Sequence, residues 1–149
     1  METTKTFSKT LILGYLFIAL LLISCSKPTT SEKAAEHAEE EEAIARTEFT
    51  EHIENFFEYE PLKAGHKSQF LIHLTDLSDG TPIEKADVNL IIRDGSNSEV
   101  TQIKARVGKV TGIYVADVTL TNKGNYKIEF YVKNDKVNER LPLTDFQVE

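Results

Sequence analysis

Residues 67–76, Lys-Ser-Gln-Phe-Leu-Ile-His-Leu-Thr-Asp, carry the pattern that decides the fold of this chain. Phe70, Ile72 and Leu74 alternate with residues that include His73, so an extended chain has one apolar face here. Alternation with a period of two over about four to eight residues is typical of a half-buried β-strand. The stretch therefore predicts a strand that turns one face toward a core.

The same alternation recurs from Thr47 onward, and turn-forming residues separate the repeats. Gly occurs with Asp or Asn at 78–80, 94–97 and 122–124, a combination that favours turns. Short strands at this spacing, with no helical pattern between them, predict an all-β fold, an immunoglobulin-like antiparallel β-sandwich over residues 47–149. We expect about seven strands, near 48–50, 54–60, 67–76, 86–93, 99–107, 112–119 and 125–133, with a candidate closing strand over 140–148.

One tyrosine stands at a predicted corner of this sandwich. The turn at 122–124 is followed by Tyr126 at the start of a predicted strand. In immunoglobulin-like folds a tyrosine at such a corner bonds a backbone group upstream. We interpret Tyr126 as a structural marker of the fold and not as part of a reactive site.

The first 25 residues have the organisation of an export signal. Lys5 and Lys9 form a short basic start, and residues 11–23 are thirteen almost wholly apolar residues. This run is too short to span a hydrocarbon core, for which about 20 residues are needed, but it fits a signal-peptide core. The ending Leu-Ile-Ser-Cys resembles a bacterial lipobox, in which the cysteine is acylated. The sequence predicts a lipoprotein signal peptide over 1–24 and lipid attachment at Cys25; the alternative is a short membrane anchor with an incidental cysteine.

Processing at this site changes the charge of the protein only slightly. Cleavage before Cys25 leaves 125 residues with a net charge of −8, because residues 1–24 contain two lysines and one glutamate. Anionic headgroups repel an anionic body, so the acyl chains must supply the membrane affinity. We expect a protein anchored by lipid to a bacterial membrane and facing the periplasm, with the inner and the outer membrane both open as the anchor's location.

Residues 25–46 form an acidic link between the anchor and the predicted sandwich. From 31 to 46, six of sixteen residues are Glu and five are Ala, a composition that favours helix. Ile44 is the only larger aliphatic residue in this run, so no apolar stripe exists to dock it on a core. We interpret the segment as a solvated tether. The alternative is a weak cation-collecting arm with His37 among the carboxylates.

Length and composition exclude several classes of protein. At ~100–200 residues per domain, 149 residues leave room for one main domain. The balance of 17 Lys and Arg against 24 Asp and Glu gives a net charge of −7, which argues against a nucleic-acid partner because phosphate binding needs a basic face. The single Cys excludes an internal disulfide and a cysteine-based zinc site. Met1 is the only methionine, so a thioether copper site is also excluded.

No catalytic motif is present. The sequence has no Gly-rich phosphate loop, no Gly-x-Ser-x-Gly and no His-Glu-x-x-His, so we expect no enzyme activity, no cofactor and no identifiable small-molecule substrate. The four histidines, 37, 52, 66 and 73, show no metal-site spacing. We expect His66 to be in solvent and His73 to be on an outer sheet face or in a hydrogen bond. His37 is a weak candidate metal ligand, and imidazole with carboxylates predicts weak, poorly selective binding of Zn²⁺ or Cu²⁺.

Three stretches of the sandwich, 55–65, 68–77 and 81–88, together carry a family pattern. They contain Phe-x-Glu-Tyr-x-Pro-Leu-x-x-Gly, then Phe-x-x-His-x-Thr-x-Leu and Pro-Ile-x-x-Ala-x-Val. This part of the chain resembles the N-terminal sandwich domain of periplasmic adaptor (membrane-fusion) subunits of RND heavy-metal efflux pumps. The matching positions are Phe57, Glu58, Tyr59, Pro61, Leu62, Gly65, Phe70, His73, Thr75, Leu77, Pro82, Ile83, Ala86 and Val88.

The resemblance implies an accessory or truncated component of such an efflux system, with pump subunits as partners. It covers about Thr47 to Glu149, and the chain has no counterpart of the adaptor's helical hairpin, lipoyl-like domain or barrel. The alternative function is a generic lipid-anchored recognition module that binds a protein or a glycan through its loops or a sheet edge. A third hypothesis is a weak cation-buffering lipoprotein. In every case the membrane is a partner through acylated Cys25.

Overall fold

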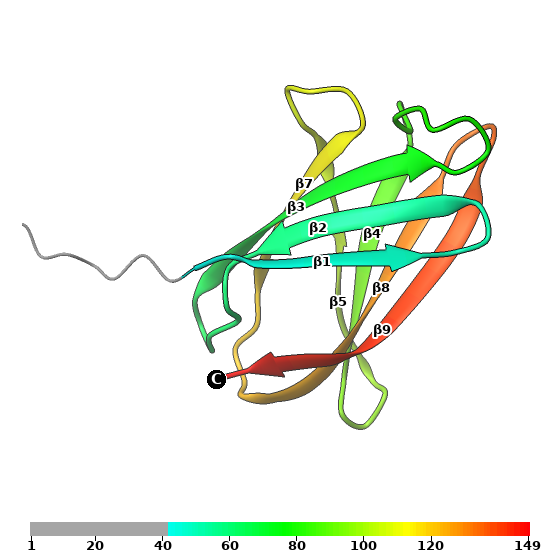
Figure 1. Ribbon diagram of the computed structural model, residues 1–149. Coiled ribbons are helices and arrows are strands. Elements are labelled where there is room, and N and C mark those ends of the chain that lie inside the picture. The colour runs from blue at the N-terminus through cyan, green and yellow to red at the C-terminus, as the bar shows by residue number, and fades with distance from the viewer. Residues whose placement is uncertain (1–41) are drawn as a thin grey trace, which may run out of the picture. The chain divides into compact units, whose positions relative to one another are not determined.

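The computed structural model describes residues 42–149, and Figure 1 shows this part of the chain as strands joined by turns and loops. The strands within these residues are β1 (Ile44–Phe49), β2 (Ile53–Tyr59), β3 (Lys67–Asp76), β4 (Asp87–Asp94), β5 (Glu99–Lys104), β6 (Arg106–Val107), β7 (Ile113–Thr119), β8 (Gly124–Lys133) and β9 (Asn138–Val148).

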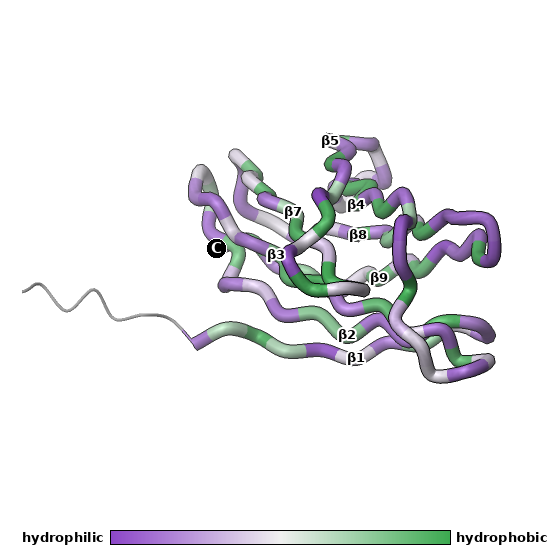
Figure 2. Tube along the Cα trace, turned by 90° about the horizontal axis from the view of Figure 1, so that it is seen from above, coloured by the Kyte–Doolittle hydropathy of each residue, from purple (hydrophilic) through white to green (hydrophobic). Residues whose placement is uncertain are grey.

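The strands form two antiparallel sheets. One has five strands in the order β1-β2-β3-β7-β6, and the other has four in the order β5-β4-β8-β9. The two sheets pack face to face, and Figure 2 shows apolar and polar residues alternating along the strands. The predicted all-β antiparallel sandwich is confirmed.

The core lies between the sheets and is rich in aromatic rings. Phe57 of β2 contacts Phe130 of β8 with ring centroids 4.8 Å apart, and Tyr59 stacks on Phe70 at the same separation. The alternating residues of the predicted strands fill this layer, because Phe70, Ile72 and Leu74 are all buried. Aromatic pairs at such distances add about 0.5–1.5 kcal/mol each beyond their buried area.

Two strand boundaries differ from the sequence-based expectation. The predicted strand 99–107 is two strands, because the chain changes sheets at Ala105. The Ala105 N–H makes a last hydrogen bond with the four-stranded sheet, to the Val88 carbonyl at 2.8 Å. The chain then continues as β6 of the other sheet. The first strand begins at Ile44, inside the segment interpreted as the tether. Its alternation is hidden in the sequence because charged residues, Arg46 and Glu48, occupy its inward-facing positions.

All four edge strands of the described sandwich carry a feature that opposes pairing with another chain. β1 turns Arg46 and Glu48 inward, β9 has Pro142 in its middle, and β6 is two residues long. In β5 a bulge leaves Val100 without a partner on β4. Inward charges, proline, short length and bulges are the devices by which natural edge strands avoid aggregation.

The side of the sandwich between β1 and β9 is joined by a charged contact, which we call the Arg46 clamp. The Arg46 guanidinium bonds Asp145 at 2.8 Å and Glu48 at 2.6 Å, and it lies 5.2 Å from the centroid of the Phe146 ring. A bulge in β9 places Thr144 and Asp145 opposite the single residue Lys127 of β8, and bulges commonly redirect a side chain in this way. Burial lowers the pKa of Arg46, but the hydrogen bonds and charges of Asp145 and Glu48 outweigh it and raise the pKa overall.

Candidate protein-interaction surface

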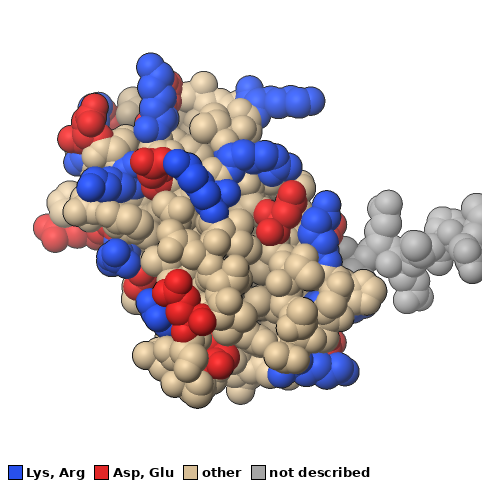
Figure 3. All heavy atoms as spheres, turned by 180° about the vertical axis from the view of Figure 1, so that it is seen from behind, with Lys and Arg blue, Asp and Glu red and all other residues tan. Residues whose placement is uncertain are grey.

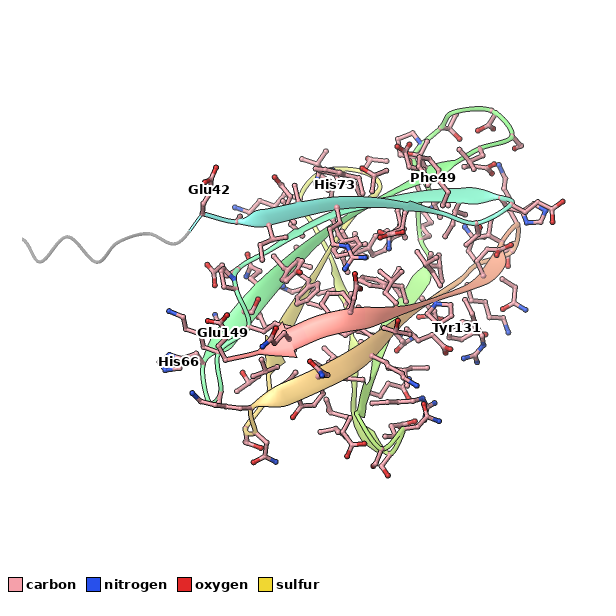
Figure 4. The ribbon with its side chains drawn as sticks, turned by 60° about the horizontal axis from the view of Figure 1, so that its bottom comes forward. Glu42, Phe49, His66, His73, Tyr131 and Glu149 are labelled. Carbon is pink, nitrogen blue, oxygen red and sulfur yellow. The ribbon has the colours of Figure 1, made fainter. Side chains whose placement is uncertain are left out.

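The two ends of the sandwich carry different loops. Glu42, His66 and Glu149 lie at one end, and Phe49 lies toward the other, as Figure 4 shows. Because the strands are antiparallel, the end that holds Phe49 also holds the β1–β2 turn (50–52), the β3–β4 loop (77–86) and the β6–β7 loop (108–112). We call these three segments the distal loops.

Backbone contacts join the distal loops to one another. The Leu77 N–H donates to the His52 carbonyl at 2.9 Å, and the Leu74 N–H donates to the Gly112 carbonyl at 3.0 Å. Gly112 has φ +76°, and a Cβ atom there would lie 2.5 Å from the Cβ of Pro82. Only glycine combines this backbone conformation with so close an approach. The three loops therefore form a connected surface, not independent tips.

Exposed apolar side chains are concentrated at this end. Among residues 42–149 six large apolar side chains are exposed, and four of them belong to the distal loops or the strand ends that enter them: Phe49 (60%), Leu77 (44%), Val107 (66%) and Val110 (61%). Single exposed apolar residues are ordinary on protein surfaces, and several at one end of the sandwich make that end the candidate interaction surface. Loops held by a rigid scaffold commonly carry binding residues.

The β3–β4 loop is held in one shape by its own side chains. The Asp76 carboxylate accepts bonds from the Ser78 N–H at 2.9 Å and the Ser78 hydroxyl at 2.6 Å. These bonds lower the pKa of Asp76. Asp79 accepts the equivalent pair from Thr81, and Gly80 takes a positive φ of +71° between them. Leu77 is thus presented on a pre-formed turn, which reduces the entropy lost on binding.

The distal loops combine apolar side chains with polar ones. Four exposed aliphatic and aromatic side chains lie among polar and charged ones, and such apolar groups desolvate well against another protein surface. Within the described residues no three His, Cys, Asp or Glu side chains are grouped so as to hold a metal ion. That same part of the chain contains no helix long and apolar enough to cross a membrane.

The sequence-predicted residues fall into two groups, those that the structure describes and those that it does not. Cys25 and His37 lie outside the described residues, so lipid attachment and the weak metal site stay predictions. The Tyr126 hydroxyl donates to the Asn122 carbonyl at 2.9 Å, four residues upstream. His66 is exposed, as expected. His52 is exposed too, and its Nδ1 lies 2.7 Å from Glu139 Oε1.

His73 occupies the outer face of the five-stranded sheet, as expected. It is half-buried beside Phe56, with ring centroids 5.2 Å apart, and its Nε2 atom has no hydrogen-bond partner. The histidines of the described part are spread over different surfaces and do not converge.

Sequence patterns alone missed the distal loops as a surface. Leu77 and Val110 sit beside turn residues, where strand alternation has no bearing on exposure. The available signal was the presence of large apolar residues in Leu-Ser-Asp-Gly and Val-Gly-Lys-Val, segments that otherwise read as turns. Their proximity depends on which strand ends share one end of the sandwich.

Comparisons with known proteins give a distant likeness of architecture. No protein-family model matches the chain, and no curated protein matches it. FetP from uropathogenic Escherichia coli strain F11 is similar over 72% of this chain and 97% of its own, with 9% identity and a TM-score of 0.47. A copper-bound variant of Campylobacter jejuni P19 is similar over 72% and 98%, with 8% identity and the same TM-score.

Neither of these proteins is an efflux adaptor domain. At such identities and TM-scores, the copper named for the second protein says nothing about a ligand of this chain.

Proposed function

We propose that this chain is a lipid-anchored periplasmic recognition module that binds a protein partner through the distal loops. The observation that carries the proposal is the position of Phe49, Leu77, Val107 and Val110 on connected, pre-formed loops. In this role the sandwich is a scaffold and the protein performs binding and not catalysis.

The loops are favoured over the sheet edges as the binding element. Strand addition needs a free, flat edge, and each edge of the described sandwich has a charge, a proline, a bulge or a very short length that opposes it. A protein partner is favoured over a glycan because the distal loops and the strand ends that enter them expose four large apolar side chains.

The sequence resemblance suggests the identity of the partner. We propose that it is a subunit of an RND heavy-metal efflux system, with this chain as an accessory component. Support comes from the adaptor-like pattern, because its matching positions Leu77, Pro82 and Ile83 lie in the β3–β4 loop. The periplasmic location and the lipid anchor rest on the predicted signal and Cys25.

Site-specific photo-crosslinking in the native envelope tests this function. A photoreactive amino acid at Val110 should form adducts with one envelope protein, and the same amino acid at Val100 serves as the control. Val100 is also an exposed valine (48%) but lies on β5, away from the distal loops. Identical adducts at both positions, or none at Val110, would contradict the proposal. Adducts with a protein unrelated to efflux would refute the efflux partner while retaining the recognition role.

A pair of matched variants gives the second measurement. Val107→Ser with Val110→Ser should abolish the adduct formed from a probe at Leu77, whereas Val100→Ser should leave it unchanged. Both variants replace exposed valines, so their free energies of unfolding should stay within about 0.5 kcal/mol of the parent. Loss of the adduct in the Val100 variant would show that the effect is not specific to the loops.

A further inference from the structure

The outer face of the four-stranded sheet has an excess of positive charge within an acidic protein. Strand alternation places eight charged residues on this face, five basic and three acidic, which we call the basic face: Arg93, Lys104, Lys127, Lys133, Arg140, Asp87, Glu99 and Glu129. Its net charge is +2, whereas the whole chain carries −7. Tyr131 lies on the same sheet (Figure 4).

The three carboxylates of the basic face are already engaged. Asp87 pairs with Lys104 at 2.5 Å, Glu99 with Arg93 at 3.5 Å, and Glu129 with Arg140. Arg140 also lies 4.3 Å from the centroid of the Tyr131 ring. Lys127 and Lys133 are in no ion pair with described residues, and the Lys127 ammonium donates to the Asn97 side-chain oxygen at 3.1 Å. The uncompensated charge is therefore centred on Lys127 and Lys133.

The opposite outer face has the other sign. The five-stranded sheet turns Glu54, Glu58 and Asp117 outward against Lys67 and Arg106, a net charge of −1. Figure 3 shows acidic and basic side chains next to one another over the back of the molecule, so neither sign is segregated there. Counted over the outward residues of the strands alone, the two sheets differ in net charge, +2 for the four-stranded sheet and −1 for the five-stranded sheet.

We propose that the basic face lies against the anionic surface of the membrane that holds the anchor. The inference rests on the proposed lipid anchoring, and charge complementarity carries it. At physiological ionic strength charges interact over about 8 Å, so a membrane senses the face in contact with it and not the net charge of the whole protein. The anchor supplies affinity, and the charge asymmetry supplies orientation.

The covalent connection permits this orientation. Eighteen residues separate Cys25 from Ile44, and at about 3.3–3.6 Å per residue they reach at most roughly 60 Å. The longest strand, β9, has 11 residues and spans about 36 Å. The sandwich can therefore lie on its four-stranded sheet without straining the connection, and in that position the distal loops stay uncovered.

The expected preference follows from the net charge of each face. A basic residue near an anionic surface contributes about 1 kcal/mol. A face of net charge +2 should therefore contact the membrane roughly 25-fold more often than an uncharged face would. The face of net charge −1 is repelled instead. Orientation should disappear at about 1 M salt, where the screening length falls to about 3 Å.

Lysine acetylation footprinting tests this orientation. The chain from Cys25 to Glu149 is coupled through its single thiol to a maleimide-bearing lipid in vesicles, so the test does not depend on acylation in the cell. In vesicles with phosphatidylglycerol, acetylation of Lys127 and Lys133 should be about tenfold slower than in pure phosphatidylcholine, and Lys67 and Lys109 should be unaffected. Equal protection of Lys67, or no protection of Lys133, would overturn the proposal.

Charge reversal provides the matched control. Lys104 lies on the same face and should be protected in the parent as well. Lys127→Glu with Lys133→Glu should remove this protection, because the face then carries a net charge of −2. Lys67→Glu with Lys109→Glu changes the total charge by the same amount on other surfaces and should preserve it. Loss of protection in both double variants would mean that net charge and not the basic face is responsible. Failure of Cys25 acylation in the cell would refute the anchor and leave this result standing.

Discussion

Replacing Asn55 with leucine is expected to stabilise the protein, although the change removes a polar residue from a well-ordered strand. Asn55 is fully buried on the inner face of β2, and neither its amide nitrogen nor its amide oxygen has a hydrogen-bond partner. Glu48, directly opposite on β1, instead binds Arg46. A buried polar group without a partner costs about 1–3 kcal/mol.

The size of the effect follows from two opposing contributions. Leucine removes the two unpaired groups and has the same branching at Cγ, but its slightly larger volume costs part of the gain in a packed core. We expect the free energy of unfolding to rise by about 1–2 kcal/mol. For a domain of this size the corresponding rise in Tm is about 4–8 °C.

Denaturant unfolding of the parent and two variants checks this reasoning. Asn55→Asp is the informative control, because a buried unpaired carboxylate in a dry site should destabilise by about 3 kcal/mol or more. If Asn55→Leu lowers the free energy of unfolding while Asn55→Asp is tolerated, the site is hydrated and the amide is satisfied by water, and the reasoning is wrong.

Four further outcomes are expected. Cys25→Ala should release the protein from the membrane and leave the precursor unprocessed, and fatty-acid incorporation into the Ala variant would contradict this. Tyr126→Phe should lower the free energy of unfolding by about 1 kcal/mol, because the bond to the Asn122 carbonyl is lost; an unchanged denaturation midpoint would contradict it. Hydrogen bonds from Ser96 and Ser98 lower the pKa of Asp94. The contribution of this carboxylate to the free energy of unfolding is therefore complete at pH values above the ordinary pKa near 3.8 and is lost as the pH falls below it. Asp94→Asn should flatten the dependence of the free energy of unfolding on pH in this acidic range. Zn²⁺ or Cu²⁺ should bind the mature chain no tighter than roughly micromolar, because ordering a backbone segment costs about 1–2 kcal/mol per residue; a stoichiometric nanomolar site in titration calorimetry would contradict this.

The sequence was sufficient for the strands whose alternation is regular, and it failed where position in the sheet decides the outcome. Phe70, Ile72 and Leu74 alternate visibly and are buried as predicted. β1 was largely missed because Arg46 faces inward at an edge, where a partner on β9 can satisfy it. That partner, Asp145, is about a hundred residues away in sequence, and no local pattern relates the two.

The candidate surface was even less accessible to sequence reasoning. Exposure of Leu77 and Val110 depends on which loops meet at one end of the sandwich, and that depends on strand order. The order places β3 beside β7 although three strands separate them along the chain. The glycine at 112 gave a turn signal, but its close approach to Pro82 is a property of the assembled loops.

The position of β1 determines how the sandwich responds to mechanical load. Any pull on the residues that precede Glu42 enters the fold at the first residues of β1. If the resisting contact is at the distal loops, the force runs along the strand axis, and the bonds between β1 and β2 are loaded together in shear instead of opening one after another. The Arg46 clamp adds a link to β9 near the start of the loaded strand. β1, which contributes no residue to the buried core, is thus well placed to transmit tension.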